Sequence, residues 1–194
     1  MKNLANFFFE VGMLKRTPRT GFQFLGSGAE SVAEHSFRTA VIGYTLACLD
    51  GEADVAKVLK MCLFHDIPEA RTGDLNYVNK KYVAVDEAKA VADLARTLPF
   101  GEEYRELLTE LAARATREAQ LVHDADQLEM ILALKEYKDL GNRYADEWYP
   151  FAVRRLQTGT ARQLAETIWA TDSTRWWFDD DAEWWVKGRK DLED

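Results

Sequence analysis

The apolar residues of this chain recur at intervals of three and four over most of its length, and this spacing constrains the fold more than any other feature. Leu4, Phe7, Phe8, Val11 and Leu14 begin the pattern, which places them on one face of an α-helix. No run of useful length alternates between apolar and polar residues, as a half-buried strand would require. We therefore expect an all-α protein of seven to nine helices, with helices at residues 4–14, 31–49, 53–67, 85–95, 104–111, 117–140, 148–156 and 160–177.

Length and composition indicate one domain. The chain has 194 residues, of which 47% are hydrophobic and 30% charged, enough to bury a single core. We expect one domain over residues 1–194, with no linker inside it. The formal net charge of −8 argues against a nucleic-acid polymer as partner, because a binding groove for nucleic acid needs a basic stripe. A small anionic substrate stays possible.

Three features indicate a cytoplasmic protein. The longest nearly apolar run, at residues 41–49, covers nine residues, far short of the roughly 20 that span a bilayer. The first residues have neither the apolar run nor the cleavage site of a signal peptide. Cys48 and Cys62 each lie in an apolar helical stretch, which predicts two reduced core cysteines and a reducing compartment.

The segment from His65 to Asp74 concentrates one imidazole and three carboxylates in ten residues. Pro68 disfavours the α conformation at the residue before it, so the helix that carries His65 should end near Ile67. The following residues, 69–74, are then expected to form a loop that lines a cavity.

A second histidine is expected to face this segment. Ser31 and Glu34 have the spacing of a capping box, so Glu34 is expected to be structural and His35 lies in the first turn of the next helix. Because a short turn joins this helix to the one that ends near His65, the two helices should be antiparallel. That arrangement brings His35 close to His65.

The helix at 117–140 carries two carboxylates on its apolar face. Asp126 and Glu129 share this face with apolar residues, whereas Asp124 points elsewhere. A buried carboxylate is costly unless it is paired, hydrogen-bonded or bound to a metal, so Asp126 is a candidate ligand. His123 could be an alternative ligand or a partner of one.

Two imidazoles and two carboxylates suit a divalent ion such as Mn, Co, Fe, Ni or Zn. The pattern of His35, then His65-Asp66, then Asp126 resembles that of the HD-domain metal-dependent phosphohydrolases. Longer segments in the same order resemble the 5'-deoxynucleotidase branch of that superfamily, over roughly residues 4–140: they are residues 16–21, 30–36, 65–69, 72–74 and 124–129. Nothing is carried over to the C-terminal helices expected within 146–194.

The resemblance implies a role for each of seven residues. It implies an HD-domain helical bundle whose metal ligands are His35, His65, Asp66 and Asp126. It further implies Glu69 as the catalytic carboxylate, Arg19 as a phosphate contact and Asp74 as a sugar-hydroxyl contact. The expected activity is release of phosphate from deoxyribonucleoside 5'-monophosphates.

Two other functions stay open at this point. The same metal site could serve a nucleoside triphosphate or nucleotide-analogue phosphohydrolase. The metal ligands indicate the type of reaction, but they say much less about the identity of the substrate. The chain could also be a helical module that senses a nucleotide without cleaving it. Trp176, Trp177, Trp184 and Trp185 near the C-terminus are expected to dock the last helices onto the core or onto a second subunit, which makes a homodimer the expected assembly.

Overall fold

The computed structural model describes residues 1–178, and in this part of the chain nine α-helices and two short 3-10 helices form the fold. The all-α prediction is confirmed. The helices are α1 Lys2–Met13, η1 Thr20–Leu25, α2 Val32–Asp50, α3 Val55–Phe64, α4 Glu69–Thr72, η2 Asn79–Lys81, α5 Glu87–Ala95, α6 Gly101–Ala113, α7 Arg117–Asp139, α8 Ala145–Val153 and α9 Gly159–Ala170.

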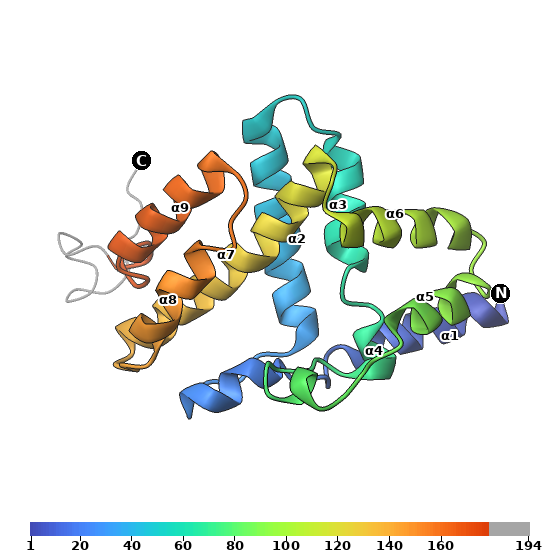
Figure 1. Cartoon of the computed structure of the whole chain (residues 1–194), viewed down its shortest axis with the longest axis horizontal. Coiled ribbons are helices and arrows are strands. Elements are labelled where there is room, and N and C mark those ends of the chain that lie inside the picture. Colours follow the sequence, from blue (N-terminus) through green and yellow to red (C-terminus); the bar gives the residue numbers. More distant parts are fainter. Residues whose placement is uncertain (179–194) are drawn as a thin grey trace, which may run out of the picture.

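Helix α7 is the centre of the fold. It contacts α2, α3, α6, α8 and α9, and Figure 1 shows it crossing α2 with α8 and α9 on one side and α3 and α6 on the other. Leu46, Met61, Leu128 and Ile131 are at most 1% exposed in the core between these helices. Burial of such side chains is the main stabilising contribution to a fold of this kind.

Two smaller apolar clusters fix the segments around this centre. Phe7 of α1, Leu94 of α5 and Tyr104 of α6 belong to one of them. In the other, Phe22 and Leu25 of η1 pack near Leu134 of α7, which attaches the segment around Arg19 to the central helix.

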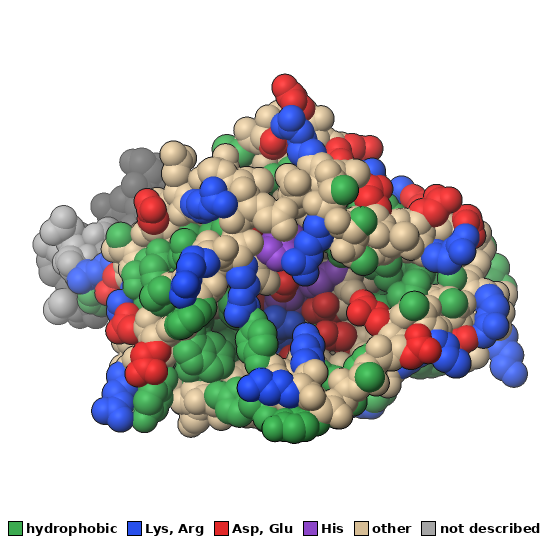
Figure 2. Space-filling model, in the orientation of Figure 1, with side chains coloured by type: hydrophobic (Ala, Val, Ile, Leu, Met, Phe, Trp, Pro, Cys, Tyr) green, Lys and Arg blue, Asp and Glu red, His purple; other side chains and the backbone are tan. Residues whose placement is uncertain are grey.

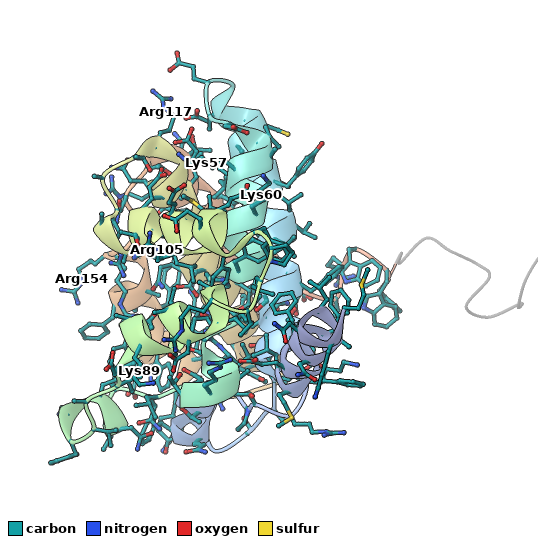
Figure 3. All side chains as sticks on the ribbon, turned by 90° about the vertical axis from the view of Figure 1, so that its right-hand side faces the viewer. Lys57, Lys60, Lys89, Arg105, Arg117 and Arg154 are labelled. Atoms are coloured by element: carbon teal, nitrogen blue, oxygen red, sulfur yellow. The ribbon has the colours of Figure 1, made fainter. Side chains whose placement is uncertain are left out.

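The surface contributes ion pairs between helices. Figure 3 shows Lys57 and Lys60 on the face formed by α3 and α6. Lys57 Nζ lies 2.6 Å from Glu110 Oε1, and Lys60 pairs with Glu103. Exposed pairs of this kind contribute little to stability, so packing of the apolar faces holds α3 against its neighbours.

A glycine allows α2 and α3 to approach closely. A Cβ atom at Gly43 would lie 2.4 Å from Cys62 Sγ, too close for any side chain at that position.

The capping box predicted at the start of α2 is confirmed. Glu34 Oε2 accepts a hydrogen bond from Ser31 N at 2.7 Å, and Ser31 Oγ accepts one from Glu34 N at 3.3 Å.

The structure corrects the prediction that residues 69–74 form a loop. Helix α3 ends at Phe64, earlier than Ile67, and residues 69–72 form the single helical turn α4. The carbonyl of Pro68 accepts hydrogen bonds from Arg71 N at 2.9 Å and Thr72 N at 3.2 Å. Proline suits the first turn of a helix because it needs no partner for an N–H group, so Pro68 begins a helical turn after ending the previous helix.

Other predicted boundaries were also wrong. The loop expected at residues 16–28 contains η1, whose Phe22 and Leu25 are buried. The last described helix ends at Ala170 and does not continue to Trp177. Trp176 is 87% exposed and does not dock on the core, while Trp184 and Trp185 lie outside the described residues.

The two cysteines differ from each other. Cys62 is buried and free as predicted, but Cys48 is exposed and not a core residue. Within residues 1–178, no helix combines the length and the hydropathy needed to cross a membrane.

Candidate active site

The two histidines expected to meet lie in contact. His35, in the first turn of α2, places its Nε2 3.3 Å from Nε2 of His65, which directly follows α3. The antiparallel packing of α2 and α3 therefore produces the predicted juxtaposition.

The opposite nitrogen of each ring is already engaged. His65 Nδ1 lies 2.7 Å from the carbonyl oxygen of Cys62, and His35 Nδ1 lies 2.6 Å from Oε2 of the buried Glu129. A carbonyl oxygen can only accept, so His65 Nδ1 carries a proton, and in the neutral ring Nε2 offers a lone pair. The carboxylate of Glu129 favours the same arrangement for His35.

Two carboxylates join the imidazoles. Asp66 Oδ2 lies 3.4 Å from His35 Nε2 and 3.2 Å from His65 Nε2. Asp126 Oδ1, from the middle of α7, lies 3.2 Å from His35 Nε2. Four acceptor atoms thus converge from α2, α7 and the segment after α3.

The side-chain donors around these four atoms lie 3.5–4.0 Å away. Thr39 Oγ1 lies 3.5 Å from His35 Nε2, and the guanidinium of Arg19 lies 3.6 Å from Asp66 and 4.0 Å from Asp126. Asp66 Oδ2 is buried with no hydrogen-bond partner among the described residues. Carboxylates and imidazoles that converge in this way are stabilised by positive charge between them, either a shared proton or a metal ion.

The spacing of the cluster fits a metal ion. Nitrogen and oxygen ligands bind a transition metal at about 2.0–2.2 Å, so two adjacent ligands of one ion lie about 3 Å apart. The measured separations of 3.2–3.4 Å are close to this value. His35, His65 and Asp126 form a group whose ligand atoms all lie within 4.8 Å of one another, and Asp66 lies outside this group but contacts both imidazoles.

The electrostatics of the cluster favour positive charge at its centre. Burial lowers the pKa of His35, but hydrogen bonds to Asp126 and Glu129 outweigh this and raise it to about 10. Burial disfavours the charged form of Asp126 as well, yet the hydrogen bond with His35 lowers the pKa of that carboxyl. A divalent ion bound there would replace the proton.

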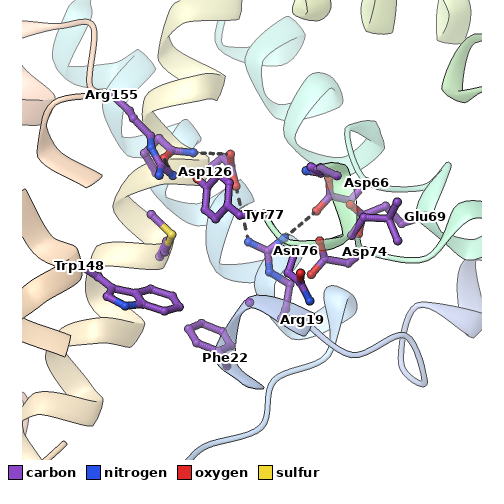
Figure 4. A pocket seen from close by; sticks show the side chains of 15 residues that line it. Arg19, Phe22, Asp66, Glu69, Asp74, Asn76, Tyr77, Asp126, Trp148 and Arg155 are labelled. Carbon is purple, nitrogen blue, oxygen red and sulfur yellow. Dashed lines mark hydrogen bonds and ion pairs between the residues drawn. The ribbon is translucent and has the colours of Figure 1, made fainter. Parts of the chain in front are cut away.

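A cavity of about 220 Å³ opens onto the cluster. Arg19, Asp66, Glu69, Asp74 and Asp126 all line it (Figure 4). Figure 2 shows histidine at the base of a hollow that also contains acidic side chains, with lysine and arginine around the rim. The arrangement gives a small anion access to the cluster from solvent.

Glu69 is placed in this cavity by the helical turn that the sequence did not predict. Its Oε2 is buried and has no hydrogen-bond partner among the described residues. Burial, followed by the charges of Asp66 and Asp74, raises the pKa of Glu69 to about 9. A divalent ion at the cluster would lower this pKa and favour the carboxylate form, and a carboxyl group with no internal partner is suited to exchange a proton with a molecule in the cavity.

Asp74 connects the two segments that form the cavity wall. Its Oδ2 accepts a hydrogen bond from Thr20 N at 2.8 Å, and its carbonyl accepts one from Thr20 Oγ1 at 2.8 Å. These bonds hold the start of η1, next to Arg19, against the segment that follows α4.

A known protein family matches the part of the chain that contains this site. A family model described as HD domain matches residues 11–169. The chain belongs to the HD-domain family. The matched region contains every residue of the cluster and of the cavity wall described above, from Arg19 to Asp126.

Relatives of this HD domain include 5'-deoxynucleotidases and solved structures with the same fold. The 5'-deoxynucleotidase HDDC2 of Bos taurus is 34% identical over 73% of this chain and 71% of its own, and that of Homo sapiens is 32% identical over 89% and 88%. A conserved hypothetical protein from Pyrococcus furiosus has a TM-score of 0.73 at 35% identity, over 86% of this chain and 99% of its own. A "predicted metal-dependent phosphohydrolase" from Magnetospirillum magnetotacticum has a TM-score of 0.68 at 26% identity, over 86% and 89%. The resemblance to the 5'-deoxynucleotidase branch is thereby confirmed, and the chain is a hydrolase of the HD-domain family.

Two other ionisable residues of α7, Asp124 and His123, have surroundings different from those of the cluster residues. The carboxylate of Asp124 accepts hydrogen bonds from Gln157 N at 2.7 Å and Thr158 N at 2.8 Å, which fixes the start of α9. His123 Nδ1 lies 3.5 Å from this carboxylate. Asp124 thus links α7 to the start of α9, and His123 lies beside this carboxylate.

Sequence reasoning missed a group of residues on the far wall of the cavity. Trp148, Arg155, Gln127 and Tyr77 line it together with the predicted residues. Trp148 lies on α8 and Arg155 just after it, in a region where the sequence carried only a helical pattern. The one available signal was the aromatic content of residues 144–151, from which no binding role was predicted.

Proposed function

We propose that this HD-domain hydrolase releases phosphate from deoxyribonucleoside 5'-monophosphates. The observation that carries the proposal is that His35 Nε2 lies 3.2–3.4 Å from ligand atoms of His65, Asp66 and Asp126, at a cavity that Arg19 also lines. The similarity to 5'-deoxynucleotidases supports the choice of substrate.

The proposed metal ligands are His35, His65, Asp66 and Asp126. Their mixed nitrogen and oxygen donors suit Mn, Co, Fe, Ni or Zn. A divalent ion would supply a Lewis acid for the phosphoryl oxygen and lower the pKa of bound water. Glu129 contributes by holding the ring of His35 through the hydrogen bond to Nδ1, a contact that typically orients such ligands.

The remaining site residues act on the substrate directly in this proposal. Arg19 presents a planar pair of donors to the phosphate oxygens. Glu69 accepts a proton from the attacking water and returns it to the 5'-oxygen as the bond from that oxygen to phosphorus breaks. Asp74 accepts a hydrogen bond from a sugar hydroxyl, and Phe22 lines the same cavity.

The substrate is tested by assaying phosphate release from the metal-loaded protein. We expect activity with deoxyribonucleoside 5'-monophosphates, a lower kcat/KM with the matching ribonucleotides, and none after chelation of the metal. Activity confined to triphosphates would contradict the proposed substrate while preserving the site, and would reassign the protein as a triphosphate hydrolase.

We also propose that two copies of the chain pair through α2. Phe37, Val41 and Tyr44 lie on one face of this helix and are 73%, 52% and 50% exposed. Contiguous apolar surface of this kind is typical of an interface between subunits. Light scattering should give the mass of a dimer for the native protein and of a monomer for Phe37→Glu; a monomeric native protein would overturn the proposal.

The proposed location is the cytoplasm. Its support is the free state of Cys48 and Cys62, which is usual in a reducing compartment. Cell fractionation tests it, and recovery in an oxidising compartment would contradict it.

A further inference from the structure

The cavity above the acceptor cluster adjoins a second, more apolar hollow. This hollow has a volume of about 360 Å³ and shares Tyr77, Met130, Trp148 and Arg155 with the first cavity. Phe24 of η1 and Phe151 of α8 complete its aromatic lining. The two hollows together therefore reach from the cluster to a group of aromatic rings.

The rings around this hollow are more exposed than aromatic side chains normally are. Phe24 is 50% exposed, and Tyr77 and Phe151 are each 58% exposed. The indole of Trp148 is partly buried against the cluster formed by Phe22 and Leu25. Exposed apolar surface gathered in a concave site, beside a few polar groups, is characteristic of a ligand pocket.

A chain of polar contacts holds the aromatic region in place relative to the cluster. Gln127 Nε2 donates to Asp126 Oδ2 at 2.8 Å, and Gln127 Oε1 accepts from Arg155 Nη1 at 3.3 Å. The guanidinium of Arg155 in turn lies 4.9 Å from the centre of the Tyr77 ring. The wall between the two ends of the space is thus built from directly linked side chains.

The two ends of this space differ in chemistry. Figure 4 shows Arg19, Asp66 and Glu69 at one end and Trp148 at the other. A ligand that fills both ends must carry a phosphate on one side and a flat, largely apolar group on the other. A nucleoside monophosphate has this form.

We infer that the hollow is the nucleobase subsite and that the indole of Trp148 is the surface on which the base stacks. The inference rests on the proposed function, because it places the phosphate at the cluster. Aromatic stacking of a base contributes about 1–3 kcal/mol, or about 5- to 150-fold in affinity. Trp148 is then a binding residue for the base and has no part in the chemical step.

The test compares a substrate that has a base with one that has none. The kcat/KM for deoxyadenosine 5'-monophosphate is divided by the kcat/KM for 2-deoxyribose 5-phosphate. In Trp148→Ala we expect this ratio to fall about 5- to 150-fold, and in Trp148→Phe to recover in part. An unchanged ratio in Trp148→Ala would overturn the inference.

Trp169 provides the matched control. It lies on α9, packs against the same apolar cluster, and stacks on Tyr149 with ring centres 4.0 Å apart. Trp169→Ala removes an indole from the packing of the C-terminal helices, so a purely structural effect would change both variants alike. We expect the ratio of Trp169→Ala to equal that of the native protein.

A binding measurement separates this inference from the proposed function. Calorimetry with deoxyadenosine, which has no phosphate, should show binding to the native protein that is weaker in Trp148→Ala. If the native protein hydrolyses neither phosphate ester but binds deoxyadenosine through Trp148, the proposed function fails and the subsite stands. Absence of binding, or equal binding by both proteins, would overturn the subsite.

Discussion

Replacing Glu69 by glutamine is expected to reduce kcat by about 10²- to 10⁴-fold, the usual contribution of a general base. The amide keeps the shape of the side chain but cannot accept the proton of the attacking water. The metal content should stay the same, because Glu69 is not among the proposed ligands. The measurement is steady-state turnover of a deoxyribonucleoside monophosphate, with metal quantified in the same sample.

A control for Glu69 is a carboxylate of a neighbouring helix that contacts the same helical turn. Glu10 of α1 pairs with Arg71 of α4 outside the cavity. Glu10→Gln weakens the attachment of α4 without changing the cavity, and its kcat should stay close to that of the native protein. Full turnover in Glu69→Gln would eliminate this residue as the base.

Replacing His65 by alanine is expected to remove metal and activity together. The variant lacks one of the four converging acceptors, and we expect metal affinity to fall by more than about 100-fold, because loss of an orienting partner alone typically costs 10- to 100-fold. Turnover should decrease to background. Metal content is measured by elemental analysis, and thermal unfolding shows that the variant is folded.

His123→Ala is the matched control for this variant. His123 is also a buried histidine, but it contacts Asp124 and not the cluster. This variant should retain the metal. The opposite result, with metal lost in His123→Ala and retained in His65→Ala, would show that the ligands are wrongly assigned.

The sequence predicted those parts of the site that depend on local rules. The capping box at Ser31 determines where α2 begins, and helical spacing determines which way His35 and Asp126 point. A short connection between two helices makes them antiparallel, which is sufficient to bring His35 and His65 together. Each of these inferences uses residues that are near one another in the chain or on one helix.

The parts that were missed depend on contacts between distant segments. η1 forms where Phe22 and Leu25 find apolar partners on α7, and nothing in residues 16–28 indicates this. Trp148 faces a cavity whose other wall is contributed by residues 19–77, so its periodicity could not distinguish a binding role from packing. Cys48 shares the apolar stretch of α2 but lies on its exposed side.

The close approach of α2 and α3 at Gly43 also affects how the site assembles. His35, His65 and Asp126 are separated by 30 and 61 residues in sequence, and only the packing of three helices brings their ligand atoms together. The unfolded chain therefore offers no comparable site, and a bound ion stabilises the folded state alone. Ion affinity in this protein is consequently a measure of helix packing, and a core substitution far from any ligand can weaken ion binding by loosening α2 from α3.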